Sequence, residues 1–205
     1  MGLIARALRR DISIGELPPD KRLKIEELRS RYGGSNHSMR EALTLLSAEG
    51  LVEATAQRGF RVSSATEADQ RDIVRLRCEI ECLGLEWSMK LANVEWESQV
   101  VAAQYQLARA IAEVTQSVSA GALAWDDADR NFHTALVSGC ESPRLISIQT
   151  KLYDQARRFR FAAMSENRIN LTKETELHSA LIDSITGHDK ALALVQLKAL
   201  INSTV

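Results

Sequence analysis

The stretch Ser35-Asn36-His37-Ser38-Met39-Arg40-Glu41-Ala42-Leu43-Thr44-Leu45-Leu46 decides how the first third of this chain folds. Ser35 is a favourable N-cap, and Ser38 with Glu41 offers a capping box as a second possible start. Apolar side chains recur along it at helical spacing, namely Met39, Ala42, Leu43 and Leu46. Polar side chains fall on the opposite face, namely His37, Arg40 and Thr44. The stretch therefore predicts a short helix with a buried back and a polar front.

The residues on both sides of this helix complete a DNA-binding arrangement. Residues 24–32 form another helical pattern, which ends at Gly33-Gly34, a pair that can adopt positive φ in a tight turn. Two helices joined by such a turn are typical of a helix-turn-helix, whose second helix enters the major groove. Residues 50–56 and 59–62 then read as two short strands around a turn at Gln57-Arg58-Gly59. A basic hairpin in this place predicts a winged helix-turn-helix.

Six short motifs over residues 3–63 carry a family resemblance: Leu17-Pro18-Pro19, Arg22-Leu23, Glu27-Leu28, Arg40-Glu41-Ala42-Leu43, Glu49-Gly50-Leu51-Val52 and Arg58-Gly59…Val62. In this order they resemble the DNA-binding head of GntR-type bacterial transcription regulators. Two places depart from the family pattern. Asp20 stands where the family usually has Gly, and Ser35–Ser38 stands where it usually reads Ser-Arg-Thr-Pro. The fold is therefore expected to follow the family, with an unusual base preference.

The polar front of the second helix supplies the predicted DNA contacts. We predict that Arg40 contacts a base, with guanine as the expected partner, and that Ser35, Asn36 and His37 lie near it. Arg58 and Gly59 at the hairpin tip are expected to meet phosphate or the minor groove.

Composition and charge suit a DNA-binding module joined to a second domain. The 205 residues are 45% apolar and 26% charged, which is ordinary for a soluble globular protein. The chain lacks an apolar run of membrane-spanning length and a signal-peptide pattern, and its three cysteines lack CxxC spacing, so we expect a cytoplasmic protein with reduced thiols. The net charge of −1 divides into +3 for residues 1–63 and −4 for the remainder. A basic head on an acidic body supports the DNA-binding prediction.

From residue 64 onward helical periodicity continues to the C-terminus. Ser64 and Glu67 can form a capping box, so we divide the chain into a winged helix-turn-helix domain, 1–63, and an all-helical effector-binding domain, 64–205. Helices are predicted for residues 65–92, 95–117, 121–138, 143–164, 170–186 and 188–203. The apolar stripe of the first comprises Ile73, Leu76, Ile80, Leu83, Trp87 and Leu91. The predicted fold is mainly α, with an antiparallel bundle of about six helices after the head.

Ionisable residues occur in this bundle where apolar ones are expected. Asp129 and His133 fall on the inward stripe of helix 121–138, and His178 lies in the middle of the stripe of helix 170–186. Burying such groups costs free energy unless they are paired or bind a ligand. Two histidines and an aspartate suit zinc, nickel or another borderline divalent metal. The alternative is a buried Asp–His hydrogen bond with an unrelated core histidine.

Residues 129–133 and 176–178 resemble the effector domain that follows GntR heads in the FadR/FCD branch. The resemblance implies that an aspartate and histidines bind a metal, with a small organic acid beside it. Asp129, His133 and His178 match three of the ligands, whereas the fourth position falls on Ala199, so the resemblance leaves metal binding open.

Arg77 is the expected anchor for the acid. It flanks the apolar stripe of helix 65–92, and with Arg158 or Arg160 it could form the fork that holds a carboxylate. The alternative is an ion pair of Arg77 with Glu81 on the helix surface. Residues 123–161 also resemble a carbon-starvation regulator of this branch that senses a five-carbon dicarboxylate, which implies a dicarboxylate effector.

These predictions describe a homodimeric transcription regulator that binds double-stranded operator DNA and responds to a small acid, without contact to a membrane. A dimer is expected because one head reads few base pairs and two-fold symmetry suits a palindromic site. A metal-dependent hydrolase is the enzyme alternative, but neither a general base nor a nucleophile accompanies the cluster at recognisable spacing. A third possibility is a DNA-binding module that has lost its sensor.

Overall fold

The computed structural model describes residues 2–55 and 59–203. The chain divides into two compact units, one of residues 1–70 with 154–162, the other of residues 71–153 with 163–205. Within the described residues, no helix combines the length and apolar character needed to cross a membrane.

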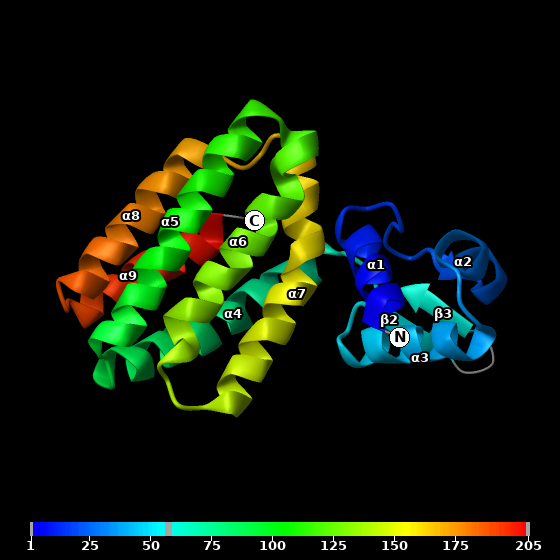
Figure 1. Ribbon diagram of the computed structural model, residues 1–205, viewed down its shortest axis with the longest axis horizontal. Coiled ribbons are helices and arrows are strands. Elements are labelled where there is room, and N and C mark those ends of the chain that lie inside the picture. Colours follow the sequence, from blue (N-terminus) through cyan, green and yellow to red (C-terminus); the bar gives the residue numbers. More distant parts are fainter. Residues whose placement is uncertain (1, 56–58, 204–205) are drawn as a thin grey trace. The chain divides into compact units, whose positions relative to one another are not determined.

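The first unit contains the predicted winged helix-turn-helix (Figure 1). Its elements are α1 (Gly2–Ser13), β1 (Arg22–Leu23), α2 (Ile25–Tyr32), α3 (Asn36–Ala48), β2 (Val52–Thr55) and β3 (Gly59–Val62). The strands form an antiparallel sheet in the order β1-β3-β2, with Val52 opposite Val62. The apolar face predicted for α3 packs with α1 in one core, which includes Leu8, Ile12, Met39, Leu43 and Leu46. Helix α3 is therefore fixed from behind, and its polar front faces solvent.

The N-terminus of α3 is set by a capping box. The Ser38 N–H donates to Ser35 Oγ over 3.1 Å, and the Ser35 N–H donates to Ser38 Oγ over 2.9 Å. The helix thus begins at Asn36, directly after the predicted cap Ser35. The second possible start, with Ser38 as cap and Glu41 as its partner, is not used.

Asp11 ties α1 to α2 from inside the head. This buried carboxylate accepts hydrogen bonds from Tyr32 Oη and Arg31 Nη2, each over 2.6 Å, and from Arg10 Nε over 2.9 Å. Burial acts to raise the pKa of Asp11, but the donors from Tyr32, Arg10 and Arg31 outweigh burial and hold that pKa below its usual value. The ionised form of Asp11 is therefore the one that the fold stabilises.

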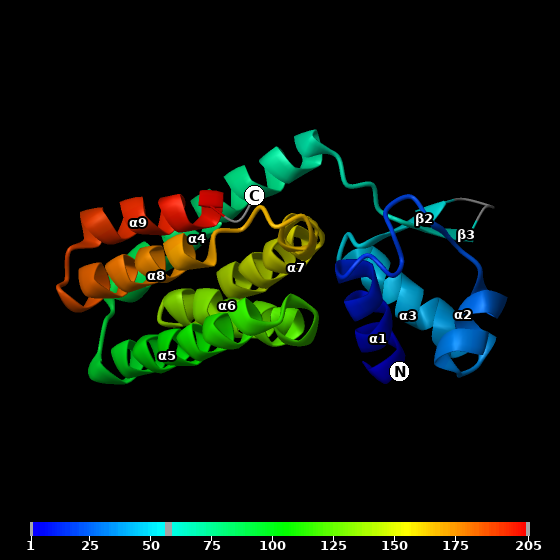
Figure 2. The same ribbon diagram turned by 90° about the horizontal axis from the view of Figure 1, so that it is seen from above.

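The predicted six helices follow the head. They are α4 (Glu67–Lys90), α5 (Val94–Gln116), α6 (Val118–Ser138), α7 (Pro143–Ser165), α8 (Leu171–Thr186) and α9 (Lys190–Ser203). Helix α5 lies against α6 and α8, and α8 lies against α9 (Figures 1 and 2). Their core includes Trp125, Phe132, Leu136, Leu181 and Leu197. The all-helical architecture is as predicted.

The inward face of α4 differs from the prediction. Four of the stripe residues are 38–47% exposed, namely Leu76, Leu83, Trp87 and Leu91. The buried face instead carries Arg77, Glu81 and the cysteines Cys78 and Cys82. The predicted stripe is therefore right only in part, since Ile73 is buried and Ile80 packs against the core. The other four residues were misplaced because charged residues rarely occupy a core unless they are paired.

Candidate functional site

The three residues predicted to bind a metal come together in the helical unit. Asp129 and His133 lie one turn apart on α6, and His178 reaches them from α8. Asp129 Oδ1 lies 3.8 Å from His133 Nε2 and 3.5 Å from His178 Nε2, and the possible ligand atoms are all within 4.8 Å of one another. All three side chains are about 2% exposed. The cluster is thus compact and buried.

Each histidine ring is oriented by a hydrogen bond from its other nitrogen. His133 Nδ1 lies 2.5 Å from Glu81 Oε2, and His178 Nδ1 lies 2.6 Å from the Glu174 carbonyl oxygen. A backbone carbonyl and an ionised carboxylate can only accept, so both Nδ1 atoms carry a proton. In the neutral ring, Nε2 then presents a lone pair to a metal. This arrangement is typical of metal-binding histidines, whose second nitrogen donates to a carboxylate or carbonyl.

The alternative interpretation, a buried Asp–His hydrogen bond, does not fit these distances. Separations of 3.5 and 3.8 Å are too long for a good hydrogen bond. Within the described part of the chain, His178 Nε2 has no hydrogen-bond partner although it is buried. The other oxygen of Asp129, Oδ2, accepts from Tyr153 Oη over 2.6 Å. The donor set of two imidazole nitrogens and one carboxylate oxygen fits a borderline divalent metal.

Arg77 and Glu81 form a buried pair beside this cluster. Arg77 Nε donates to Glu81 Oε1 over 2.8 Å, and the Arg77 guanidinium lies over the Tyr153 ring, 4.9 Å from its centre. Burial acts to raise the pKa of Glu81, but Arg77 and His133 outweigh burial and hold that pKa below its usual value. The predicted alternative, an ion pair on the helix surface, is therefore wrong in its location, because the Arg77 side chain is only 2% exposed.

Sequence reasoning missed two members of this network. Glu81 was considered only as a partner of Arg77, although its place one turn along the same helix face could have suggested contact with the cluster. Tyr153 gave no signal, since a tyrosine on an apolar stripe is most often a core residue.

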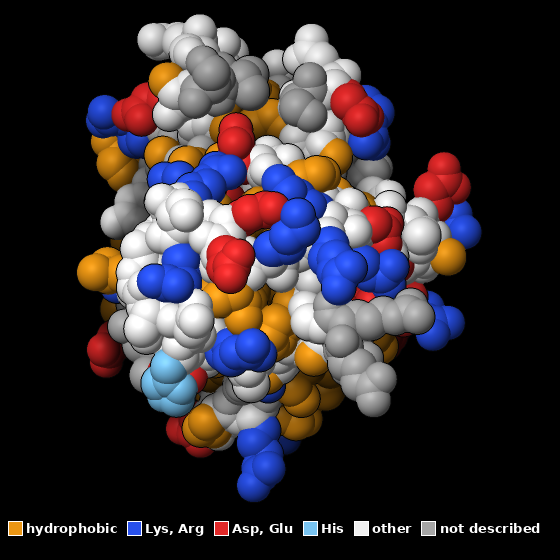
Figure 3. Space-filling view, turned by 90° about the vertical axis from the view of Figure 1, so that its right-hand side faces the viewer, with side chains coloured by type: hydrophobic (Ala, Val, Ile, Leu, Met, Phe, Trp, Pro, Cys, Tyr) orange, Lys and Arg blue, Asp and Glu red, His pale blue; other side chains and the backbone are white. Residues whose placement is uncertain are grey.

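The head presents the predicted DNA-reading residues at the start of α3. Asn36, His37 and Arg40 are exposed, and Ser35 caps the helix. His37 Nε2 lies 3.3 Å from Glu41 Oε1, whereas Arg40 makes neither a hydrogen bond nor an ion pair with the residues that the structure describes. Arg58 lies outside the described residues, and Gly59 begins β3 with φ of 88°. The face that holds α2, the start of α3 and the wing gathers Lys and Arg side chains, with acidic ones between them (Figure 3).

Comparison with known families accounts for both parts of the chain. Residues 3–62 match the bacterial regulatory proteins of the gntR family, and residues 72–203 match the FCD domain. The chain belongs to the GntR family of transcriptional regulators, in the branch with an FCD domain. Family membership confirms the expectation of a DNA-binding regulator and excludes the hydrolase alternative as the family's function.

Individual relatives agree with this assignment. The HTH-type transcriptional regulator BphR of Paraburkholderia xenovorans is 36% identical over 97% of this chain and 80% of its own length. The HTH-type transcriptional repressor GlaR of Escherichia coli is 32% identical over 92% of this chain and 86% of its own length. The solved structure of E. coli McbR/YncC covers 97% of this chain and 92% of its own, with a TM-score of 0.76 and 19% identity. This last likeness supports the fold.

In this GntR-family regulator, the two other arginines proposed for the effector are also buried. Arg158 Nη2 donates to Asp69, and Arg160 is fully buried. Arg77 and Arg158 each have a carboxylate partner, but Arg77 is linked through Glu81 to His133 of the cluster, so Arg77 is the stronger candidate for holding an acid. A role for Arg158 stays a prediction.

The fourth ligand position needs a correction. Ala199 is exposed, and the buried face of α9 consists of Ala193, Leu197, Leu200 and Ile201. A side chain at position 199 therefore points away from the core and cannot complete the cluster. Helix α9 contains no His, Cys, Asp or Glu, so no side chain of this helix can supply a fourth ligand of the usual kind.

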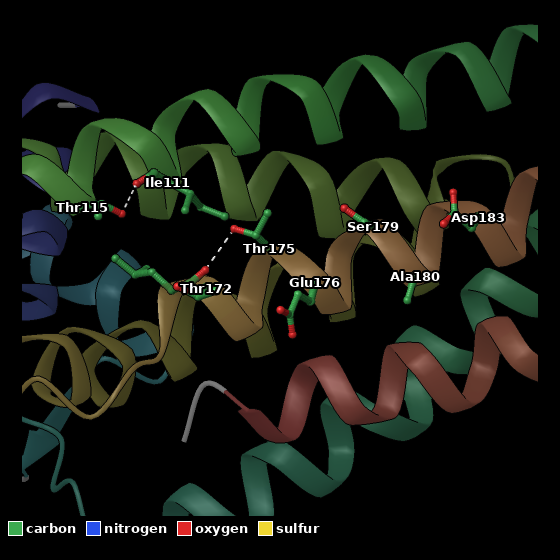
Figure 4. A pocket seen from close by; sticks show the side chains of 9 residues that line it. Ile111, Thr115, Thr172, Thr175, Glu176, Ser179, Ala180 and Asp183 are labelled. Carbon is green, nitrogen blue, oxygen red and sulfur yellow. Dashed lines mark hydrogen bonds between the residues drawn. The ribbon is translucent and has the colours of Figure 1, made fainter.

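A groove of about 550 Å³ lies between α5 and α8, and its lining differs from the buried Arg77 network in its charge (Figure 4). Thr115 and Thr175 on its walls donate their hydroxyls to carbonyls one turn back, those of Ile111 and Leu171. The charged groups among its lining residues are the carboxylates Glu176 and Asp183. None of the residues that line the groove is basic, so the buried Arg77 network is the better candidate for an acid.

Proposed function

We propose that this regulator binds operator DNA as a homodimer and that a small organic acid, held beside a divalent metal ion in the FCD domain, controls that binding. One observation carries the proposal. Two buried atoms with opposite ligand preferences, His178 Nε2 and Arg77 Nη2, lack hydrogen-bond partners among the described residues. Leaving such atoms unpaired costs about 1–3 kcal/mol each, more for a charged group, so each needs an explanation, and a bound metal and acid would satisfy both.

Asp129, His133 and His178 would hold the metal, with zinc or nickel as the expected ion. A bound ion would supply positive charge and, with three protein ligands, an open coordination position. Arg77 would hold the carboxylate of the acid, because its Nε is engaged by Glu81 while Nη2 remains available. A dicarboxylate suits a site with two separate cationic partners.

The exposed face of α4 supports a homodimer. Leu76, Ile80, Leu83 and Trp87 follow the alternating four- and three-residue spacing of a coiled-coil seam, and three of them are 38–41% exposed. A second copy of the same chain offers the matching face, as a two-fold axis requires. The dimer would place two heads on a palindromic operator.

We also place the domain boundary between residues 63 and 64, and we expect the regulator to be cytoplasmic. The name of the relative GlaR favours repression.

The metal is tested by elemental analysis of the purified regulator and of His133→Ala. We expect metal in the wild type at up to one ion per chain and a clear loss in the variant. Equal content in both proteins would mean that His133 binds no metal.

The acid is tested by thermal unfolding with a panel of two- to six-carbon organic acids, with zinc or nickel present. We expect at least one acid to raise the melting temperature of the wild type and of Arg75→Ala, a matched variant of an exposed arginine paired with Asp72. Arg77→Lys should lose this response while retaining DNA binding, which shows that it is folded. If no acid of the panel raises the melting temperature of the wild type, the proposed acid-binding site is wrong.

A further inference from the structure

Within the part of the DNA-binding head that the structure describes, a second arginine besides Arg40 is free of carboxylates. Several other basic side chains of the head are paired: Arg9 with Glu49, Arg31 with Asp11, Lys24 with Glu27 and Arg61 with Glu53. Arg29, in the last turn of α2, is exposed and has no carboxylate partner among the described residues. Unpaired cations on such a face are the groups available to DNA.

The Arg29 guanidinium is held across the turn at the start of α3. Nε donates to the Gly34 carbonyl oxygen over 3.3 Å, and Nη1 donates to Asn36 Oδ1 over 3.2 Å. The turn permits this approach because Gly34 has φ of 86°, and a Cβ there would lie 2.8 Å from Ile4 Cδ1. A side chain of α2 is thereby fixed beside the first residue of the recognition helix.

This contact decides what Asn36 can offer to a base. Its Oδ1 accepts from the guanidinium, which can only donate, so the Nδ2 group of Asn36 is the part that faces outward as a donor. An asparagine that recognises adenine uses its amide as donor and acceptor together. Arg29 takes one of the two lone pairs of Oδ1, which weakens Asn36 as an acceptor. The pair of Arg29 and Asn36 therefore presents mainly donors, which favours guanine or phosphate over adenine.

We propose that Arg29 and Asn36 act as one recognition unit, in which Arg29 positions the amide and adds its own Nη2 donors, and that this unit binds hydrogen-bond acceptors of the operator. Guanine O6 and N7 in the major groove and phosphate oxygens both provide such acceptors. The proposal adds a DNA-contacting residue from α2 to those on the recognition helix. It also gives a reason for the asparagine at a position where the family motif usually has arginine.

The test is a double-mutant cycle on a full-length regulator with an operator selected from random DNA. Affinities are measured by fluorescence anisotropy for the wild type, Arg29→Ala, Asn36→Ala and the double variant, with thermal unfolding as a check of folding. We expect each single change to weaken binding by about 5- to 150-fold, and the double variant to be little weaker than either. Lys24→Ala, which removes a cation of the same segment that is already paired, should change affinity far less.

Repeating the operator selection with Arg29→Ala shows whether the hydrogen-bond acceptors belong to guanine or to phosphate. A relaxed preference at one base pair of each half-site identifies guanine. An unchanged preference with a shallower salt dependence identifies phosphate. The proposal is overturned if Arg29→Ala loses no more affinity than Lys24→Ala, or if the effects of the two single changes on binding free energy simply add.

Discussion

Glu81 Oε2 lies 2.5 Å from His133 Nδ1, so a carboxylate on α4 fixes the proton position and orientation of a ring on α6. The same carboxylate is held in place by Arg77 through its other oxygen. The anchor proposed for the acid and the proposed metal ligand His133 are therefore linked through one side chain, which gives a physical route for coupling between acid and metal.

Glu81→Gln should lower metal affinity by about 10- to 100-fold without abolishing binding, because the amide keeps the shape but loses the charge that supports the imidazole. Competition with a coloured chelator measures the affinity. Glu79→Gln, an exposed carboxylate two residues earlier on α4, is the control and should bind as the wild type does. Wild-type affinity in Glu81→Gln would show that this hydrogen bond does not tune the site.

Arg40→Ala should weaken binding to the selected operator by about 1–3 kcal/mol and relax discrimination at one base pair. Wild-type affinity should also fall steeply with salt, because phosphate contacts release counterions. Arg75→Ala serves as a control, since it removes an arginine from the FCD domain. If Arg40→Ala binds as tightly as the wild type, the DNA-facing side of α3 has been misassigned.

Asp11 predicts an acid-sensitive head. Its pKa is lowered on folding, so its stabilising contribution is complete above the ordinary value of about 3.9 and is lost as the pH falls through the lower folded value. At neutral pH, Asp11→Asn should destabilise by about 2–3 kcal/mol, because buried hydrogen bonds to charged partners are lost. Calorimetric unfolding from neutral to strongly acid pH measures the difference between the two proteins. A difference that does not shrink toward acid pH would contradict this role.

Trp87→Glu should dissociate the proposed dimer, because a charge would have to be buried in the α4 face. Sedimentation at low micromolar concentration distinguishes monomer from dimer. Val195→Glu introduces the same charge at an exposed apolar residue of α9 and should leave the oligomeric state unchanged. If Trp87→Glu is dimeric and Val195→Glu is monomeric, the dimer interface lies on α9 and not on α4.

Local chemistry made most of the fold predictable. Caps, glycines and periodicity located all six helices after the head, and Ser35 marked the start of α3. The helix predicted to begin at residue 121 begins at Val118 instead. Gly121 lies inside α6, where a Cβ would come within 2.6 Å of Val114 Cα on α5, so the glycine serves close packing of the two helices.

The site was predictable only in part. Asp129, His133 and His178 stood out because ionisable residues on apolar stripes are costly unless they are used. The burial of Arg77 with Glu81 could not be read from α4 alone, since its more apolar face is the one left exposed. The hydrogen bond from Arg29 to Asn36 depends on the geometry of a glycine turn, which no spacing rule specifies.

Control of DNA binding by the acid is tested by the operator affinity of the metal-loaded regulator, measured with and without the acid that most stabilises it against heat. We expect this acid to change the operator Kd of the wild type by at least about 5-fold, a typical allosteric coupling, and Arg77→Lys to bind the operator without responding. An operator Kd that is the same with and without the acid in the wild type, or an equal response in Arg77→Lys, would contradict this control.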